Sequence, residues 1–409
     1  MNKKTVADID VKGKRVLVRV DFNVPLDKEG NITDDRRIRG ALPTIQRILE
    51  GGGRAVCMSH LGRPDGKAEP KYSLRPAAKR LGELLGQTVP IAPDCIGARA
   101  VDLVNTLQNG QCCLLENLRF HTAEEIKDKK AKDDPALRKQ KDEFARQIAE
   151  MGDAYVNDAF GTCHRDNASM LTVPQLMEGK PRVIGFLVKK ELDFLGDAVA
   201  SPARPFVVVL GGAKVSDKIG VIERLAGLCD KILIGGAMTY TFRAAAGVHV
   251  GHSLVERNHL DQARRLRELA GAKLVLPVDS VVVENIEPNA KTQICRDAIP
   301  DDWMGVDIGP EAVEAYRQEL LAAKTIVWNG PVGVFETPPF DTGTLAIAKA
   351  VAEATTRGAV SIIGGGDSAA AVERMGLSEK MTHISTGGGA SLEFLEGKPF
   401  KAIDILDKA

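Results

Sequence analysis

The chain has 409 residues, 44% hydrophobic and 27% charged, which suits a globular protein long enough for two cores. Lysine plus arginine equals aspartate plus glutamate at 55 each, which argues against a general basic surface for DNA or RNA. No run of about eighteen apolar residues and no signal-peptide core is present, so we expect no membrane span and a cytoplasmic protein. The seven cysteines lack a zinc-type spacing, which favours buried free thiols.

Four segments of the first half read as buried strands, each followed by a loop with polar or basic side chains. The strands are predicted at residues 14–20, 54–58, 111–115 and 153–157. Basic residues at or after these strand ends are Arg37, His60, Arg63, Arg119, His164 and Arg165. Because the carboxyl ends of parallel strands meet at one edge of a sheet, we expect these groups to bind a small, multiply anionic ligand.

Asp21 and Asn23 follow the first strand, where ligand-binding groups are expected. They also precede a proline, so a plain turn is the alternative interpretation. Arg36, Arg37 and Arg39 lie in the first turns of the next predicted helix, where arginine opposes the helix dipole. Local conflicts of this kind tend to mark functional positions. Further along, residues 123–141 are highly charged and read as a solvated loop that leads into a helix near residues 144–148.

Residues 185–201 are predicted to form a helix near the middle of the chain. Val188, Leu192, Leu195 and Val199 recur on one helical face, and the prolines at 202 and 205 end the segment. Strand–helix units of about one domain's length lie on each side. We interpret the segment as a helix that joins two halves, and one more helix packed on a sheet is the alternative.

The second half reads as strands followed by glycine-rich loops. Strands are predicted at residues 205–210, 231–236, 272–277, 281–283 and 360–363, with a further strand and rigid loop over 325–336 and a loop or short strand over 303–309. Glycine after a strand lets the backbone approach a phosphate, and Lys214 supplies charge near Gly211 and Gly212. No Walker A motif is present and no GxGxxG follows residues 205–210, which disfavours a dinucleotide oxidoreductase. Asp367 suits a helix cap or a Mg²⁺ ligand, and Glu336 a surface charge or a ribose ligand.

Eight motifs, taken together, resemble the phosphoglycerate kinase family. They run in order from near residue 8 to near residue 400: RVDFNVP (19–25), SHLGRPDG (59–66), ENLRF (116–120), DAFGTCHR (158–165), LGGAKVSDKI (210–219), WNGPVGVFE (328–336), GGGDS (364–368) and STGGGASLE (385–393). Each motif alone is weak, and the ordered set is specific. One departure concerns Cys163 and Asn167, where the family usually has alanine and often a second histidine.

The resemblance implies an α/β protein of two Rossmann-like domains, whose parallel sheets face each other across a cleft and are joined by a central helix. Residues 1–184, with the tail 400–409, would bind 3-phosphoglycerate or 1,3-bisphosphoglycerate. Residues 185–201 would form the interdomain hinge. Residues 202–399 would bind ADP or ATP with Mg²⁺. The implied protein is a monomeric glycolytic phosphotransferase without nucleic-acid or membrane partners.

The resemblance also assigns residues to roles. The catalytic set would be Arg37, Lys218, Gly365 and Gly388. The phosphoglycerate would be bound by Asp21, Asn23, Arg37, His60, Leu61, Gly62, Arg63, Arg119 and Arg165. The nucleotide would be bound by Lys214, Lys218, Gly235, Gly236, Gly309, Asn329, Glu336, Gly365, Gly366, Asp367 and Ser368, and the metal by Asp367.

The implied reaction is direct phosphoryl transfer between an acyl phosphate and ADP, which needs no general base because the attacking oxygen is already anionic. Two alternatives stay open from the sequence: an ATP-dependent kinase for another phosphorylated acid, and a non-catalytic phosphate-binding protein of the same fold. Retention of Arg37, Lys214, Lys218 and Asp367 disfavours the second.

Overall fold

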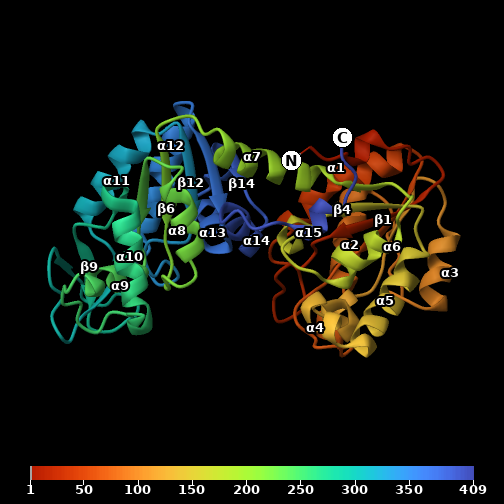
Figure 1. Cartoon of the computed structure of the whole chain (residues 1–409), viewed down its shortest axis with the longest axis horizontal. Coiled ribbons are helices and arrows are strands. Elements are labelled where there is room, and N and C mark those ends of the chain that lie inside the picture. The colour runs from red at the N-terminus through yellow and green to blue at the C-terminus, as the bar shows by residue number, and fades with distance from the viewer. Residues whose placement is uncertain (1) are drawn as a thin grey trace. The chain divides into compact units, whose positions relative to one another are not determined.

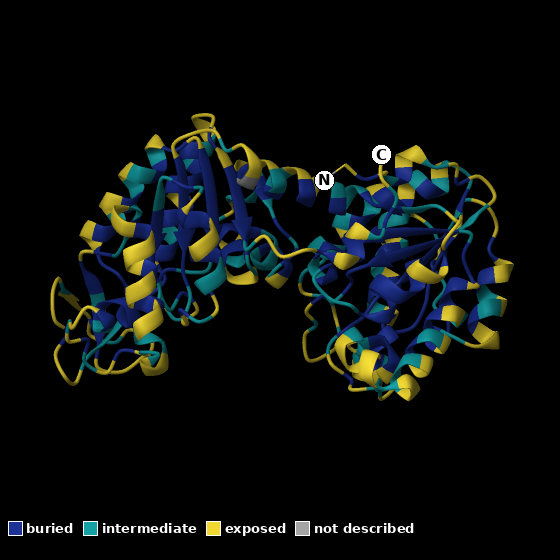
Figure 2. Ribbon diagram, viewed as in Figure 1, coloured by how far each residue is buried: buried dark blue, intermediate teal, exposed yellow. Residues whose placement is uncertain are grey.

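The computed structural model describes residues 2–409, and the chain divides into two compact units. Unit 1 comprises Met1–Asp193 with Pro399–Ala409, and unit 2 comprises Phe194–Lys398 (Figure 1). Buried residues gather on the strands of each unit and on the helix faces that cover them (Figure 2). No helix in the described part of the chain is long and apolar enough to cross a membrane.

Unit 1 is built on a five-stranded parallel sheet of order β3-β2-β1-β4-β5. The strands are β1 Arg15–Val20, β2 Arg54–Met58, β3 Cys112–Leu114, β4 Ala154–Asp158 and β5 Arg182–Ile184. The helices are α1 Arg36–Glu50, α2 Arg75–Leu85, α3 Ala98–Thr106, α4 Asp128–Asp133, α5 Pro135–Ala149, α6 Val173–Leu176 and α15 Lys401–Asp404. One core joins the apolar faces of β1, α1 and α2, with Val18 and Ile45 fully buried.

Unit 2 contains a six-stranded parallel sheet of order β14-β13-β12-β6-β7-β8. Its strands are β6 Phe206–Leu210, β7 Lys231–Ile234, β8 Leu274–Val275, β12 Thr325–Asn329, β13 Val360–Gly364 and β14 His383–Ile384. Its helices are α8 Ile219–Ala226, α9 Met238–Ala245, α10 Leu260–Ala270, α11 Pro310–Ala322, α12 Thr342–Thr356, α13 Gly366–Arg374 and α14 Gly389–Leu395. Both sheets are parallel, as predicted, and in each the first strand of the unit lies inside the sheet, which is the doubly wound order.

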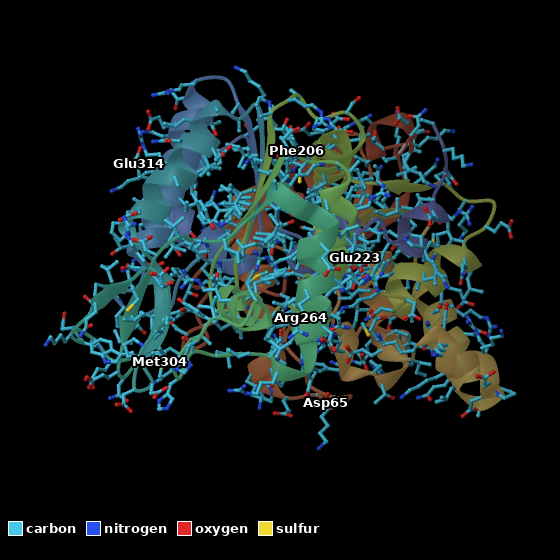
Figure 3. The ribbon with its side chains drawn as sticks, turned by 60° about the vertical axis from the view of Figure 1, so that its left-hand side comes forward. Asp65, Phe206, Glu223, Arg264, Met304 and Glu314 are labelled. Atoms are coloured by element: carbon cyan, nitrogen blue, oxygen red, sulfur yellow. The ribbon has the colours of Figure 1, made fainter. Side chains whose placement is uncertain are left out.

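A second, smaller sheet in unit 2 is an addition to the predicted fold. Residues 281–283, expected as a strand, form part of β9 Ser280–Val283. This strand pairs antiparallel with β10 Gln293–Cys295 and with β11 Met304–Ile308. Figure 3 labels Met304 at the start of β11 and Phe206 at the start of β6, which mark the two sheets.

The central helix α7, Phe186–Ala200, covers nearly all of the segment predicted as helical. Val188, Leu192 and Leu195 are buried, as their shared face predicted, and the side chain of Val199 lies outside the described residues. The boundary between the two units falls inside this helix, after Asp193.

Two segments of unit 1 differ from or extend the expectation. Residues 123–141 are largely helical rather than a solvated loop, since they contain α4 and much of α5. Lys141 is fully buried and donates to Asp128 Oδ1 at 2.7 Å, which ties the two helices together. The C-terminal tail lies in unit 1, where Lys4 N donates to Asp407 O at 3.0 Å and the Phe400 ring packs against Phe160.

Candidate active site

In unit 1 the loops after three neighbouring strands are joined by hydrogen bonds at the carboxyl edge of the sheet. Asn23, after β1, accepts from the Gly62 amide at 2.9 Å. Arg119, after β3, donates from Nη1 to the Gly62 carbonyl at 2.7 Å. Asn117 Nδ2 donates to the carbonyl of Leu61 at 2.8 Å. The convergence predicted for these loops is therefore present, and Gly62 is the residue on which they meet.

Arg37 is distinguished from its neighbours by its partner. Arg36 pairs with Asp34 and Arg39 with Asp35, so two of the three arginines are neutralised locally. Arg37 instead donates to Asp21 Oδ1 at 2.8 Å, while a third of its side chain stays exposed. Burial opposes ionisation of Asp21, but the charges of Arg37 and Arg19 hold the pKa of Asp21 below its usual value. Asp21 is thus ionised and orients Arg37.

His60 is buried and is not a cation in this environment. Its Nε2 lies 4.0 Å from Asp21 Oδ1, and its Nδ1 lies 3.2 Å from Arg19 Nη2. Burial, together with the charges of Arg19, Arg119 and Arg37, lowers the pKa of His60 well below its ordinary value despite Asp21. His60 therefore offers a neutral hydrogen-bonding group, which corrects the expectation that it adds positive charge.

Arg19 is a site residue that the sequence reasoning did not single out. It lies inside β1, is almost fully buried, and donates to Ser169 Oγ at 2.8 Å. Glu124 Oε1, also buried, lies 3.9 Å from Arg19 Nη2. A charged residue within an otherwise apolar strand was the available signal, because such a residue must be paired when buried.

The remaining arginines differ in exposure. Arg119 is buried, its Nε lies 3.0 Å from Glu125 Oε1, and its Nη2 has no hydrogen-bond partner in the described structure. Burial lowers the pKa of Arg119, and the nearby charges of Arg165 and Arg19 lower it further against the effect of Glu125. Arg165 is half-buried and Arg63 exposed. A buried guanidinium beside other cations is the environment in which a bound anion is most stabilising.

In unit 2 the corresponding edge of the sheet is made mainly of backbone. The Gly212 amide donates to Pro331 O at 2.9 Å, and the Gly236 amide donates to Val332 O at 2.8 Å. A Cβ on Gly211 would lie 2.0 Å from Pro331 O, and one on Gly235 would lie 2.5 Å from Val332 Cβ. The glycines after β6 and β7 therefore allow these loops to pack directly against the loop after β12.

Lys218 is the buried cation of this edge. Its Nζ donates to Asn329 Oδ1 at the end of β12, and Asn329 Nδ2 has no partner among the described residues. Burial lowers the pKa of Lys218 to about 8, although Asp217, Asp367 and Glu396 raise it. The amine is still protonated at neutral pH, and its partner Asn329 lies close to Gly365, which precedes α13.

The start of α13 lies beside Asn329 and Gly330. Gly365, with φ +88°, lies close enough that an added Cβ would approach Asn329 Nδ2 to 3.4 Å. Ser368 Oγ accepts from the Gly330 amide at 2.7 Å. Asp367 is exposed in the first turn of α13, and its charge acts on Lys218. An exposed carboxylate in the first turn of a helix fits a Mg²⁺ ion shared with phosphate oxygens.

Four further predicted nucleotide or catalytic residues belong to loops and helix starts of unit 2. Lys214 and Glu336 are exposed. Gly388, with φ +50°, precedes α14. Gly309 precedes α11, and a Cβ there would meet the Asp279 carboxylate at 2.2 Å. Asp279 accepts from the Ala312 amide at 2.8 Å, so Gly309 makes room for a helix cap.

Comparisons with known proteins agree on one family. A family model described as phosphoglycerate kinase matches residues 6–398. Curated phosphoglycerate kinases from Rhodopirellula baltica and Chloroherpeton thalassium are 54% and 51% identical, each over the full length of both chains. Solved phosphoglycerate kinases from Coxiella burnetii and Pyrococcus horikoshii are 39% and 32% identical, with TM-scores of 0.84 and 0.83 over 98% of both chains. The chain belongs to the phosphoglycerate kinase family.

Proposed function

We propose that the chain catalyses reversible, Mg²⁺-dependent phosphoryl transfer from 1,3-bisphosphoglycerate to ADP, which yields 3-phosphoglycerate and ATP. Membership of the family supports the reaction class. The observation that carries the proposal is the division of chemistry between the units. Unit 1 holds Arg37 and a buried Arg119, and unit 2 holds Lys218 beside glycine-rich loops. Such a pair of sites suits an acidic phosphorylated substrate and a nucleotide.

Within this proposal, Arg63, Arg119 and Arg165 hold the phosphate of the glycerate that does not react, and His60 donates a hydrogen bond to the substrate. Asp21 and Asn23 contact the glycerate part of the substrate. The buried cation Arg119 supports this assignment, since phosphate oxygens would supply the hydrogen-bond partners that its guanidinium lacks. Leu61 and Gly62 act through their position, because they hold the loops after β1 and β3 together.

The transferred phosphoryl group would be stabilised by Arg37 and Lys218. Both are cations whose side chains are oriented by a neighbouring oxygen, Asp21 in one case and Asn329 in the other. A bound Mg²⁺, held by Asp367, would neutralise charge on the nucleotide's phosphate oxygens. No general base is required, since the attacking oxygen is anionic in either direction. Catalysis is then positioning and charge stabilisation.

The other assignments for unit 2 are also proposals. Gly235, Gly236, Gly365, Gly366, Gly388 and Ser368 would present backbone and hydroxyl groups to phosphates, Lys214 would supply further charge, Gly309 would line the nucleotide pocket and Glu336 would accept from the ribose. The exposure of Lys214, Glu336 and Asp367 supports access to a nucleotide.

A coupled assay with 3-phosphoglycerate and ATP tests the proposed reaction. We expect ADP formation that depends on Mg²⁺ and stops when chelator is added. Activity with another phosphorylated acid but not with 3-phosphoglycerate would make this chain a different kinase. ATP binding without turnover of any such acid would favour a non-catalytic role.

Because the proposed substrates bind to different units, transfer out of contact with water requires the two units to close on both ligands. We propose that α7 and its flanks, residues 185–201, serve as the hinge between a phosphoglycerate domain (1–184 with 400–409) and a nucleotide domain (202–399). Small-angle scattering tests this: the radius of gyration should fall with both substrates bound and change little with either alone. The cytoplasmic location and the monomeric state stay predictions, which fractionation and light scattering would check.

A further inference from the structure

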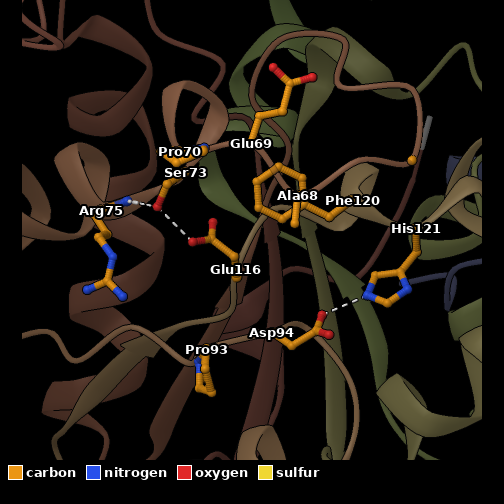
Figure 4. A pocket seen from close by; sticks show the side chains of 11 residues that line it. Ala68, Glu69, Pro70, Ser73, Arg75, Pro93, Asp94, Glu116, Phe120 and His121 are labelled. Carbon is orange, nitrogen blue, oxygen red and sulfur yellow. Dashed lines mark hydrogen bonds and ion pairs between the residues drawn. The ribbon is translucent and has the colours of Figure 1, made fainter.

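Unit 1 contains a cavity of about 480 Å³ that the proposed reaction does not use. Figure 4 shows the side chains that line it. Its wall combines the apolar side chains of Pro70, Pro93 and Phe120 with polar groups. At one end of the view Asp94 and His121 point toward one another, and at the other Glu116 accepts from Ser73 Oγ at 2.7 Å.

Asp94 and His121 belong to a three-residue cluster that could ligate a metal. His121 Nε2 lies 2.7 Å from Asp94 Oδ1. With Cys95, one ligand atom from each residue lies within 4.8 Å of the other two. Ligand atoms around a tetrahedral Zn²⁺ lie roughly 3.4–3.6 Å apart, as the usual Zn–N, Zn–O and Zn–S lengths require. Side-chain movements of about 1 Å would therefore complete the geometry.

The cluster is held in place by its surroundings. The Cys95 amide donates to Asp94 Oδ1 at 2.6 Å, which fixes the carboxylate relative to the neighbouring thiol. The His121 ring lies 5.4 Å from the Phe144 ring, which restricts its rotation. Cys95 is fully buried, whereas the Asp94 and His121 side chains are 45% and 28% exposed, so a cation can reach the cluster through the cavity. A preset cluster costs little side-chain entropy on binding.

We propose that Asp94, Cys95 and His121 bind a divalent transition metal of the zinc type, with a fourth position open to the cavity. Thiolate and imidazole ligands select Zn²⁺ or Co²⁺ over Mg²⁺ or Ca²⁺, which prefer oxygen alone. The metal–sulfur bond replaces the S–H bond, and the thiol proton leaves to solvent.

The site would connect two loops of unit 1. Asp94 and Cys95 precede α3, whereas His121 follows directly on the turn Leu118–Phe120, which carries Arg119. A metal at this position would hold the loop of Arg119 against the start of α3. The site is separate from the proposed Mg²⁺ ligand Asp367, which lies in unit 2.

Cobalt titration of the full chain tests the site. The chain is treated with chelator, desalted and titrated with Co²⁺ without nucleotide, while thiolate-to-cobalt absorption in the near ultraviolet is recorded. We expect a saturable band that Zn²⁺ displaces. Cys95→Ser should abolish the band, and His121→Gln should weaken Co²⁺ binding at least about tenfold. A wild-type chain without the band, or a Cys95→Ser chain that keeps it, would overturn the proposal.

Two matched variants serve as controls. His249 Nε2 lies 2.7 Å from Asp301 Oδ1, the same pair without a cysteine, so His249→Gln should leave the band and the affinity unchanged. Cys113→Ser removes another buried thiol of unit 1 and should also keep the band. Loss of the band in either control would assign the cobalt to another site. If Cys95→Ser does not fold, His121→Gln decides: unchanged Co²⁺ affinity in that variant contradicts the site, and a loss of at least about tenfold supports it.

Discussion

Each proposed substrate site lies at the carboxyl edge of a parallel sheet, and the first strand of the unit is central in both sheets. The two sites nevertheless differ in the groups that form them. In unit 1 the edge is made of side chains, of which Arg37, Asp21 and the buried Arg119 are the main examples. In unit 2 it is made mostly of glycine backbone, together with the buried cation Lys218. Guanidinium groups suit a small acid with few atoms, whereas backbone amides suit the phosphate chain of a nucleotide.

This difference predicts how each site fails. A site of side chains should lose function when a side chain is shortened, with little effect on the fold. A site of closely packed backbone should lose function when a side chain is added, because the loops must move apart. The predictions below compare one unit with the other.

Arg37→Ala should have the largest effect. We expect turnover to fall on the order of 10³-fold or more, by analogy with other arginines that act on a transferring phosphoryl group. ADP affinity should change little, because Arg37 belongs to unit 1. The coupled assay gives the first quantity and calorimetric titration of ADP the second. Arg39→Ala is the matched control, since Arg39 pairs with Asp35 and is 54% exposed. Near-normal turnover in Arg37→Ala would contradict its role.

Gly236→Ala tests the backbone-built site. Gly236 has φ +69°, and a Cβ there would lie 2.5 Å from Gly212 O. We expect the free energy of unfolding to fall by about 2–4 kcal/mol, from the left-handed backbone and the crowding together. Nucleotide affinity should fall at least about tenfold because the loops after β6 and β7 separate, a loss of about 1.4 kcal/mol in binding. Urea unfolding and ADP titration measure the two effects.

Gly247→Ala separates strain from crowding in that test. Gly247 also has positive φ, at +81°, but an added Cβ there would meet nothing within 4 Å. Gly247→Ala should lower the free energy of unfolding by about 1–2 kcal/mol and leave ADP affinity unchanged. Equal loss of ADP affinity in both variants would show that the close approach of the loops is unimportant for the nucleotide.

Lys218 gives unit 2 a pH dependence that the arginines of unit 1 do not share. Burial lowers the pKa of Lys218 to about 8, so the free chain loses this charge as the pH rises through that value. We expect kcat/KM to fall above pH 8, approaching about tenfold per pH unit. Lys218→Arg should move this fall to higher pH, because arginine stays protonated. Lys214→Arg, at an exposed position, should not. An unchanged profile in Lys218→Arg would assign the fall to another group.

The sequence predicts the parts of the sites that depend on strand order. Residues that follow β1, β2 and β3 meet on Gly62 because the strands are parallel neighbours. The neutrality of His60 could not be predicted, since it depends on burial and on Arg19 from another strand. Nor could the packing role of Gly211 and Gly235, because the loop that they contact follows β12, far along the chain.

Charge patterning misled in one place for a related physical reason. The segment 123–141 has no apolar period, so it reads as solvated, yet Glu124 and Lys141 are fully buried. Each is compensated by a partner from elsewhere: Glu124 accepts from the Ser169 amide at 2.9 Å, and Lys141 donates to Asp166 O at 2.6 Å. Buried charge becomes predictable only when its partner is known.

Both units contain a buried carboxylate that accepts hydrogen bonds from backbone amides near the start of a helix. Asp158 accepts from the Leu187 amide of α7 at 2.9 Å, and Asp307 accepts from the Gly343 amide of α12 at 2.6 Å. Burial raises the pKa of each to about 7. A Cβ on Gly185 would lie 2.1 Å from Asp158 Oδ1, so this glycine at the start of α7 admits the carboxylate.

Asp158→Asn should have the smallest effect and should act on unit 1 alone. An unfolded aspartate titrates near pH 4, so between about pH 4 and 7 the folded chain holds a proton that the unfolded chain releases. The stability that this proton gives is complete below pH 4 and is lost as the pH rises through 7. Asparagine stays neutral at every pH. Between pH 5 and 7 the free energy of unfolding of the variant should therefore fall by on the order of 1 kcal/mol less than that of the wild type. Asp307→Asn should do the same for unit 2. Hydrogen exchange followed separately for β4 and β12 distinguishes the units, and equal pH dependence in wild type and variant would mean that Asp158 is ionised when folded.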